Sequence, residues 1–269
     1  MSRIRRYKSL QTALENQDDV KHLVLKTNIF QYEICALHNL EILRLISPNY
    51  PLEIPEEIIH LSKLRSLAFR NTEVGTFPSF IGDLKNLEKI DFGKNVVKID
   101  AKIWELEKLN AVRIDCSHLE KFPEDIINCA SLEHIEIKGF NENPSIHLKD
   151  ILLVLAKLPN LKSLNLSSQE IKTLPKEIGD LQHLVYLDIT FTGLQSVPED
   201  LSKLHNLQTI RLMENSRELK AQIKKYLPNK GKLVSKWTVD VRGLKATQHA
   251  VRDTQMYITG EAPVIYNNV

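Results

Sequence analysis

The chain has 269 residues, enough for one large domain or two small ones, and 42% of them are hydrophobic, which is sufficient for a substantial core. Its 36 basic and 34 acidic residues nearly balance and only 6% of the residues are aromatic, so the composition argues against nucleic acid and anionic membranes as partners. The basic start has no apolar stretch behind it, and no apolar run is long enough to span a bilayer; we therefore expect a cytoplasmic protein without a signal peptide.

Residues 1–19 are predicted to contain an N-terminal capping helix. Leu10, Ala13 and Leu14 have the spacing of one apolar helix face, and Ser9 stands where a helix N-cap is expected. We expect this helix to cover the end of the repeated structure that follows.

From residue 20 to residue 215 the pattern Leu-x-x-Leu-x-Leu, with other apolar residues at some positions, recurs about nine times. The units start at Val20, Leu40, Leu64, Leu87, Leu109, Leu132, Leu161, Leu184 and Leu207. Successive starts are 20, 24, 23, 22, 23, 29, 23 and 23 residues apart, a regularity that chance does not produce. A repeat of this length predicts stacked copies of one structural unit.

Most units carry a second signal, an apolar residue followed by proline. The prolines are Pro55, Pro78, Pro123, Pro175 and Pro198. Proline restricts φ and removes a hydrogen-bond donor, so it is expected to stop the strand and to begin the convex side of the coil. The unit that starts at Leu87 has Asp100 in place of this proline.

These residues resemble the leucine-rich-repeat family, in particular its intracellular class with the 23-residue unit Leu-x-x-Leu-x-Leu-x-x-Asn-x-Leu-x-x-Leu-Pro-x-x-Ile-x-x-Leu. Bacterial members, and the plant class related to Ras-binding repeat proteins, are the most similar groups. The resemblance covers residues 20–215. It implies an α/β repeat fold, a leucine-rich-repeat solenoid (horseshoe) with a parallel sheet on the concave face and helical caps.

The spacing within a unit follows from the geometry of a short strand. Positions one, four and six are predicted to point into a core that stacked coils share, because no single coil can bury its own leucines. Polar residues at position nine, such as Thr72 and Gln169, are expected to satisfy backbone groups of a neighbouring coil. The unit that starts at Leu132 is 29 residues long, and the apolar spacing of residues 148–155 predicts a true helix there.

Two elements are predicted after the repeats. Residues 216–231 are expected to form a C-terminal capping helix, because apolar residues recur along one helix face and Pro228 follows. Residues 232–269 are expected to hold one more strand, from Leu233 to Arg242, and then a flexible tail over residues 243–269.

The sequence holds no motif for phosphate, dinucleotide or zinc-hydrolase chemistry. His22 and His134 are expected on the concave face but too many strands apart to share a metal ion. Three cysteines cannot pair completely, which predicts reduced thiols; Cys129 is expected in the core, and Cys116, just after a strand, at an accessible place. We therefore predict no enzyme activity, no cofactor, no metal and no small-molecule substrate.

Side chains at positions three, five and seven of each strand are not needed for the core and line the predicted concave face. Aromatic and Arg side chains there are common anchors of interfaces, whereas a strip of opposite charges between them is also expected as ion pairs of little energetic value. The predicted partner-binding residues are Ile42, Arg44, Ile46 and Arg70 in an N-terminal group, Asp91, Arg113 and Glu136 in the strip, and Tyr186, Asp188, Phe191, Arg211 and Met213 in a C-terminal group.

The sequence therefore predicts a protein-binding module, or a signalling scaffold, that binds a protein partner on its concave face. Neither nucleic acid nor a membrane is expected as a partner. Two alternatives stay open. One is a non-catalytic subunit of an enzyme complex that uses the C-terminal tail, and the other is an exported effector that acts on host proteins.

Overall fold

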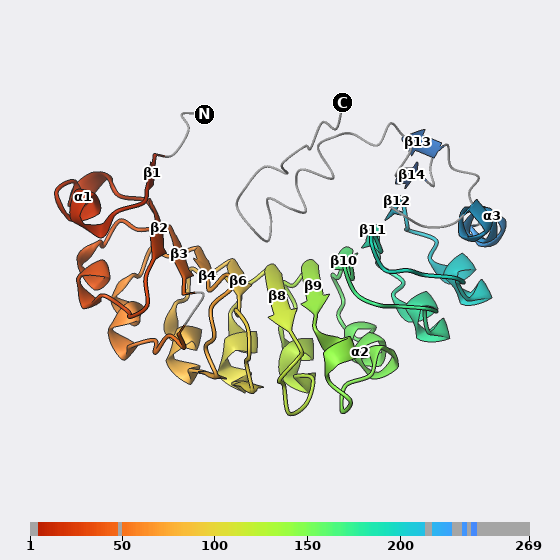
Figure 1. Cartoon of the computed structure of the whole chain (residues 1–269), viewed down its shortest axis with the longest axis horizontal. Coiled ribbons are helices and arrows are strands. Elements are labelled where there is room, and N and C mark those ends of the chain that lie inside the picture. Colours follow the sequence, from red (N-terminus) through yellow and green to blue (C-terminus); the bar gives the residue numbers. More distant parts are fainter. Residues whose placement is uncertain (1–4, 48–49, 213–216, 228–232, 236–237, 241–269) are drawn as a thin grey trace. The chain divides into compact units, whose positions relative to one another are not determined.

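The computed structural model describes residues 5–47, 50–212, 217–227, 233–235 and 238–240. The chain divides into residues 1–131 and residues 132–269, hereafter unit 1 and unit 2. In each unit short strands lie side by side, and short helices lie on the other side of the coils (Figure 1). Within the described residues, no helix is both long enough and apolar enough to cross a membrane.

The strands of unit 1 form a parallel sheet. Their order is β1 (Arg6–Tyr7), β2 (His22–Lys26), β3 (Ile42–Ile46), β4 (Ser66–Ala68), β6 (Lys89–Asp91) and β8 (Ala111–Asp115). A second, smaller sheet pairs β5 (Thr76–Phe77) with β7 (Lys98–Ile99). The helices are α1 (Leu10–Leu14) and the 3-10 helices η1 (Gln17–Asp19), η2 (Tyr32–Ala36), η3 (Glu56–His60), η4 (Ser79–Asp83), η5 (Ala101–Glu105) and η6 (Glu124–Asn128).

Unit 2 continues the same coil design. Its parallel strands are β9 (His134–Lys138), β10 (Ser163–Asn165), β11 (Tyr186–Asp188) and β12 (Thr209–Arg211). Beyond them, β14 (Thr238–Asp240) pairs antiparallel with β12, and β13 (Leu233–Ser235) pairs antiparallel with β14. The helices are η7 (Phe140–Glu142), α2 (Leu148–Leu155), η8 (Lys176–Asp180), η9 (Glu199–Lys203) and α3 (Arg217–Tyr226).

The repeated leucines fill the core, as predicted. Leu40, Leu43 and Leu45, at positions one, four and six of the repeat that starts at Leu40, are all 0% exposed. Burial of such a side chain contributes about 1.5–3 kcal/mol of transfer free energy. In unit 1 a row of aromatic rings extends this core, with centroid distances of 5.7 Å for Phe69–Phe77, 4.7 Å for Phe77–Phe92 and 5.7 Å for Phe92–Trp104.

The 3-10 helices begin where the apolar–proline signal predicts. Pro55, Pro78, Pro123, Pro175 and Pro198 immediately precede η3, η4, η6, η8 and η9, with φ between −80° and −61°. Asp100 takes the same place before η5 with φ −71°, and its Oδ1 accepts a hydrogen bond from the Lys102 backbone N–H at 3.0 Å. In that coil a carboxylate cap therefore replaces the proline.

Polar side chains at position nine join neighbouring coils, which confirms that prediction at two places. Thr72 Oγ1 accepts a hydrogen bond from Ser47 N at 2.8 Å and donates one to Leu45 O at 3.2 Å. Gln169 Oε1 accepts a hydrogen bond from Gly139 N at 2.9 Å. These side chains satisfy backbone groups at turns that the strands leave without partners.

A second ladder of polar contacts was not predicted. Asparagine residues directly before the first leucine of a repeat donate a side-chain hydrogen bond to a backbone carbonyl of the preceding coil. The pairs are Asn39 with Asp18 O, Asn86 with Ser62 O and Asn206 with Gln182 O, at 2.8–3.0 Å. Lys63 and Lys108 then donate to the amide oxygens of Asn39 and Asn86 at 2.7 and 2.6 Å. This ladder runs along the start of the strands.

Helices occupy the three places where the sequence predicts them. In α1 the Ser9 hydroxyl accepts a hydrogen bond from Thr12 N at 3.4 Å, as expected of an N-cap. The helix predicted in the 29-residue repeat that starts at Leu132 is confirmed as α2, whose buried side packs against η8. α3 buries Leu219 and Ile223 and packs against η9.

The prediction of one strand from Leu233 to Arg242 is wrong. The structure has two short strands there, β13 and β14, which pair antiparallel with each other. Antiparallel neighbours require the chain to reverse its direction between them, and period-two spacing does not reveal where such a reversal occurs. The predicted tail, residues 243–269, lies outside the described residues.

Two glycines allow 3-10 helices of adjacent coils to approach closely. Gly82 in η4 and Gly179 in η8 occupy the same repeat position. A Cβ added to Gly179 would lie 2.5 Å from Asp200 O, and one added to Gly82 would lie 2.8 Å from Lys102 Cγ and 2.9 Å from Lys102 O. The first obstacle is backbone in one case and a movable side chain in the other.

We predict that Gly179→Ala lowers the free energy of unfolding by about 1–3 kcal/mol, because the methyl group forces two coils apart. Gly82→Ala should lower it less, since the Lys102 side chain can move and the nearest backbone atom is 2.9 Å away instead of 2.5 Å. Urea-induced unfolding followed by circular dichroism measures both. Ser202→Ala, at the same repeat position in η9, is the control and should change stability by less than about 0.5 kcal/mol; equal stability of the Gly179 variant and the wild type would contradict the close-approach explanation.

Candidate protein-binding surfaces

Each unit has a strand face, defined as the side chains at positions three, five and seven of its repeats. Their neighbours at positions four and six point into the core. Alternation along the strand therefore turns the strand-face residues the other way.

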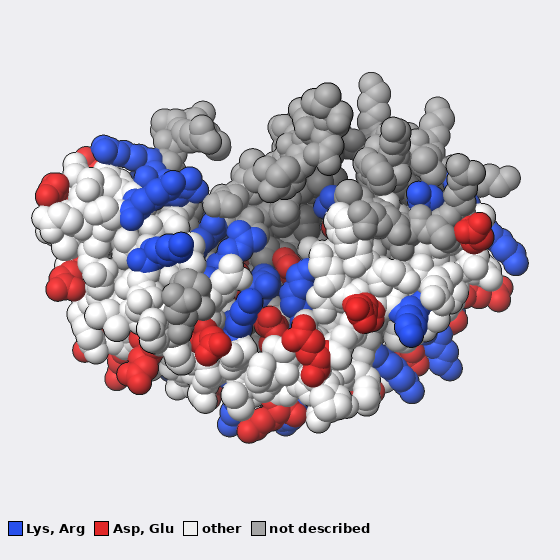
Figure 2. All heavy atoms as spheres, in the orientation of Figure 1, with Lys and Arg blue, Asp and Glu red and all other residues white. Residues whose placement is uncertain are grey.

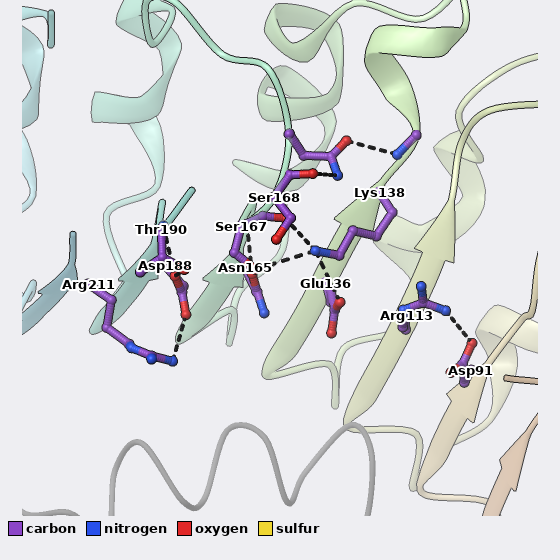
Figure 3. A network of polar contacts seen from close by, with 12 residues as sticks. Asp91, Arg113, Glu136, Lys138, Asn165, Ser167, Ser168, Asp188, Thr190 and Arg211 are labelled. Atoms are coloured by element: carbon purple, nitrogen blue, oxygen red, sulfur yellow. Dashed lines mark hydrogen bonds and ion pairs between the residues drawn. The ribbon is translucent and has the colours of Figure 1, made fainter. Parts of the chain in front are cut away.

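On the strand face of unit 2 one buried carboxylate organises a cluster, named the Asp188 cluster (Tyr186, Asp188, Thr190 and Arg211). Asp188 is 3% exposed. Its Oδ1 accepts hydrogen bonds from Thr190 N at 3.0 Å and Thr190 Oγ1 at 2.8 Å, and its Oδ2 accepts one from Arg211 Nη1 at 3.0 Å (Figure 3). Asp188 Oδ2 also accepts a hydrogen bond from the Tyr186 hydroxyl at 3.3 Å. Burial and the charge of Asp188 raise the pKa of the Tyr186 hydroxyl, which therefore stays a neutral donor.

Unit 1 repeats the central pair of this cluster. Asp91 and Arg113 are direct partners in the register of β6 and β8, as Asp188 and Arg211 are in β11 and β12. Arg113 Nη1 lies 3.0 Å from Asp91 Oδ1, and Asp91 is 3% exposed (Figure 3). The predicted ion pair in the charged strip is confirmed for these two residues.

A turn-forming side chain recurs at position five. Its oxygen accepts a hydrogen bond from the backbone N–H two residues later, which holds the end of the strand. The pairs are Asp91 with Gly93 at 3.1 Å, Asn165 with Ser167 at 2.9 Å and Asp188 with Thr190 at 3.0 Å. The signal is visible in the sequence as Asp or Asn two positions before Gly, Ser or Thr. The predictions nevertheless assign Asp188 to partner binding, and Asp91 to partner binding or to an ion pair, without a role in the turn.

Phe191 follows the Asp188 cluster in an unusual backbone conformation. Its φ is 55°, in the left-handed region, and its side chain is 45% exposed. The same repeat position is filled by Asn71 (φ 53°), Gly139 (φ 69°) and Ser168 (φ 59°) in other coils. Small and polar residues tolerate the left-handed region better than a bulky aromatic residue, which rarely adopts it.

The structure places the predicted partner-binding residues in different environments. Ile42, Ile46, Arg70, Arg113, Glu136 and Arg211 are partly exposed, and Phe191 is exposed. Met213 lies outside the described residues. Glu136 lies 3.5 Å from Lys138 Nζ on the same strand, and Lys138 also donates to the backbone oxygen of Ser167 (Figure 3).

Four residues expected on the surface are buried instead. Arg44 is 5% exposed and stands on β3, between β2 and β4. Tyr186 is 6% exposed and directs its hydroxyl to Asp188, which is itself buried, as is Asp91. Strand alternation predicts which side a residue faces but not how far neighbouring side chains cover it, so the expected exposure of these four residues is wrong.

Two lysines on the strand face of unit 1 and three exposed apolar residues near it are not among the predicted partner-binding residues. Lys26 ends β2 and is exposed, and Lys89 begins β6 and is partly exposed; burial lowers the pKa of the Lys89 ammonium group. In the segments that follow β2 and β3, Ile29, Tyr32 (the first residue of η2) and Tyr50 are 71%, 62% and 56% exposed. Lys26 was missed because the first unit is degenerate.

The cysteines are all buried and none is in a disulfide. Cys129 is 1% exposed, which confirms its core position, but Cys116 is 0% exposed and the expected accessibility is wrong. Burial, with the charge of Asp115, raises the pKa of the Cys116 thiol to about 12, and burial with the charge of Glu57 raises the pKa of Cys35 to about 11. Within the described residues, no three His, Cys, Asp or Glu side chains form a group able to hold a metal ion.

We predict that Asp188→Ala lowers the free energy of unfolding by roughly 3 kcal/mol, because Arg211, Tyr186 and Thr190 all lose a buried acceptor. Asp188→Asn keeps an oxygen for the Thr190 N–H and should lose about half as much. Urea unfolding measures both variants. An Asp188→Ala protein as stable as the wild type would show that the cluster does not hold this turn.

The thiols should be unreactive in the folded protein. At pH 8 the raised pKa values keep Cys35 and Cys116 protonated, and the thiolate is the reactive form. We expect a thiol-exchange reagent such as DTNB to label less than one thiol within minutes in buffer and all three in urea. Rapid labelling in buffer, assigned to Cys116 by mass spectrometry, would contradict its burial.

Known proteins share this pattern. Residues 136–229 match a family profile described as a leucine-rich repeat region. The adenylate cyclase of Schizosaccharomyces pombe is 25% identical over 227 residues, which cover 70% of this chain and 13% of that enzyme. Osteomodulin of Rattus norvegicus is 29% identical over 192 residues, which cover 61% of this chain and 44% of osteomodulin. The chain thus spans less than half the length of either relative.

Among solved structures, a leucine-rich-repeat protein of Leptospira interrogans superposes with a TM-score of 0.56 at 24% identity, covering 83% of this chain and 63% of that one. This likeness concerns the fold alone. It agrees with the parallel sheets, inward leucines and short helices of the two units, and the predicted solenoid fold is confirmed. The chain therefore has the leucine-rich-repeat fold, and residues 136–229 match that family's profile.

Proposed function

We propose that this protein is a non-catalytic binding module that holds a protein partner on its strand face, with Phe191, in the turn that follows β11, as an anchor at the edge of this face. Leucine-rich-repeat proteins generally bind other proteins. The adenylate cyclase match covers only 13% of that enzyme, so it gives no reason to expect its reaction here.

One observation carries the proposal, the combination of backbone strain and exposure at Phe191. An aromatic residue in the left-handed region costs about 1–2 kcal/mol relative to ordinary backbone. Burial offsets only part of this cost, because the residue is 45% exposed. Asn71, Gly139 and Ser168 make the equivalent turn with smaller side chains. A strained, exposed aromatic residue is therefore best explained by a contact outside the chain.

The surroundings of Phe191 suit an anchor. Thr190, directly before it, is fixed by two hydrogen bonds to Asp188, and Thr192, directly after it, donates to Ile189 O at 2.9 Å. Arg211, 24% exposed at its side chain, lies beside the same carboxylate. An anchor held on a rigid base loses little conformational entropy when a partner binds.

The finer features are part of the same proposal. The unit spacing favours the intracellular 23-residue class, and three buried cysteines that form no disulfide fit a reducing compartment. We therefore propose a cytoplasmic scaffold in signalling. A cytoplasmic fraction that lacks the protein in cell fractionation would contradict this address.

We predict that Phe191→Asn raises the free energy of unfolding by about 1 kcal/mol, because asparagine tolerates the left-handed turn. The same change should reduce capture of the partner about tenfold, since the anchor is lost. Urea unfolding measures the first effect, and quantitative mass spectrometry of proteins captured from native lysate by wild-type and variant protein measures the second.

Leu153→Asn is the matched control for this experiment. Leu153 lies on α2 in the same unit and is 42% exposed, so its replacement removes a similar apolar surface away from the strand face. It should leave capture unchanged. If Phe191→Asn captures the same proteins in the same amounts as the wild type, Phe191 is not the anchor.

A further inference from the structure

The strand face of unit 1 has an excess of positive charge. Its described basic residues are Lys26, Arg44, Arg70, Lys89 and Arg113, and its described acidic residues are Asp91 and Asp115. The excess is one of number, five basic against two acidic side chains at these positions. Figure 2 shows Lys and Arg side chains gathered over unit 1, in the left half of the view.

Unit 2 differs in this respect. On its described strand face Lys138 lies beside Glu136, and Arg211 lies beside Asp188. Its charges therefore balance within short ion pairs, which contribute little to attraction at a distance. Among the described strand-face residues, the excess of basic over acidic side chains therefore belongs to unit 1.

Apolar side chains accompany the basic ones. Ile46 is the register partner of Lys26, and Ile42 lies in the same cross-strand row as Ser66 and Lys89. Neighbouring strands are about 4.8 Å apart. A segment that crosses the strands in an extended form therefore meets basic and apolar side chains in turn.

The segments that follow β2 and β3 carry exposed apolar side chains. Thr27 N donates to Ile46 O, and Ser47 Oγ donates to Tyr50 O, which keeps the two turns beside their strands. Ile29, Tyr32 and Tyr50 are the most exposed large apolar side chains of the described residues. Exposed apolar groups next to a charged surface are typical of protein interfaces.

We propose that the strand face of unit 1 binds an extended acidic segment of a partner protein, in which acidic residues alternate with apolar ones. This inference rests on the proposed protein-binding function and names the chemistry of the partner. The apolar rows favour a protein over a nucleic acid, since the strand-face positions of unit 1 carry no aromatic side chain among the described residues on which bases would stack. Residues 241–269 of the chain itself have three basic and two acidic residues, so they do not match this charge.

The test is fluorescence anisotropy of the full chain with a labelled 12-residue peptide made of six Glu-Leu repeats. We expect saturable binding that weakens at least fivefold when NaCl rises from about 50 to about 300 mM, because exposed charges are screened. Lys26→Glu and Arg70→Glu should each raise Kd about tenfold. Arg70→Gln, which only removes the charge, should raise it less.

Lys98→Glu is the matched control, because Lys98 is an exposed lysine of unit 1 that lies on β7 and not on the strand face. Its Kd should stay within about twofold of the wild type, and circular dichroism checks that every variant is folded. A peptide with lysine in place of the acidic residues should not bind.

Several results would overturn the inference. These are no binding of the acidic peptide, equal losses in the Lys98 and Arg70 variants, or equal competition by a 12-nucleotide single-stranded DNA. A salt-sensitive dimer in sedimentation velocity that Arg70→Glu abolishes would assign the face to a second copy instead. Phe191→Asn should leave peptide binding unchanged. If the wild-type protein does not bind the acidic peptide but Phe191→Asn still reduces capture of a partner from lysate, this inference is rejected and the proposed function stands.

Discussion

The whole structure depends on the fact that one coil cannot bury its own leucines. Each coil presents apolar side chains along two flanks, and only a neighbouring coil with the same spacing covers them. This requirement fixes positions one, four and six of every unit, as the full burial of Leu40, Leu43 and Leu45 illustrates. It leaves positions three, five and seven without a role in the core, so their chemistry reflects turns, ion pairs and contacts with other molecules.

The sequence was sufficient to predict the elements that obey this spacing. The repeat strands, the start of each 3-10 helix after proline and the helix α2 all follow from the positions of leucine, isoleucine and proline. The Asp100 cap shows what the spacing does not predict. The sequence reveals that proline is missing at this position, but not that a hydrogen bond from Lys102 N to Asp100 replaces it. A carboxylate in a loop has many possible partners, and the sequence does not say which is nearest.

The strand face was harder to predict for a related reason. Alternation assigned Arg44 and Tyr186 to the correct side, yet both are buried because the residues of adjacent strands and a nearby carboxylate decide how a long side chain lies. The Asp91–Arg113 pair was foreseeable, since residues at the same position of successive units become direct neighbours in register. Its counterpart, the Asp188–Arg211 ion pair, has a second role, because Asp188 also accepts the hydrogen bond from Thr190 N that holds the turn before Phe191. This ion pair therefore helps to position an exposed aromatic side chain.

The asparagine ladder has a consequence for how such a chain can change in length. Each of its hydrogen bonds joins a side chain to the carbonyl of the coil before it, and the partner stands at the same place in every coil that uses the ladder. Duplication or loss of a complete unit during evolution would therefore recreate the same contact at the new junction. A gain or loss of a few residues would instead separate donor from acceptor in every bond across that junction, which favours growth by whole units.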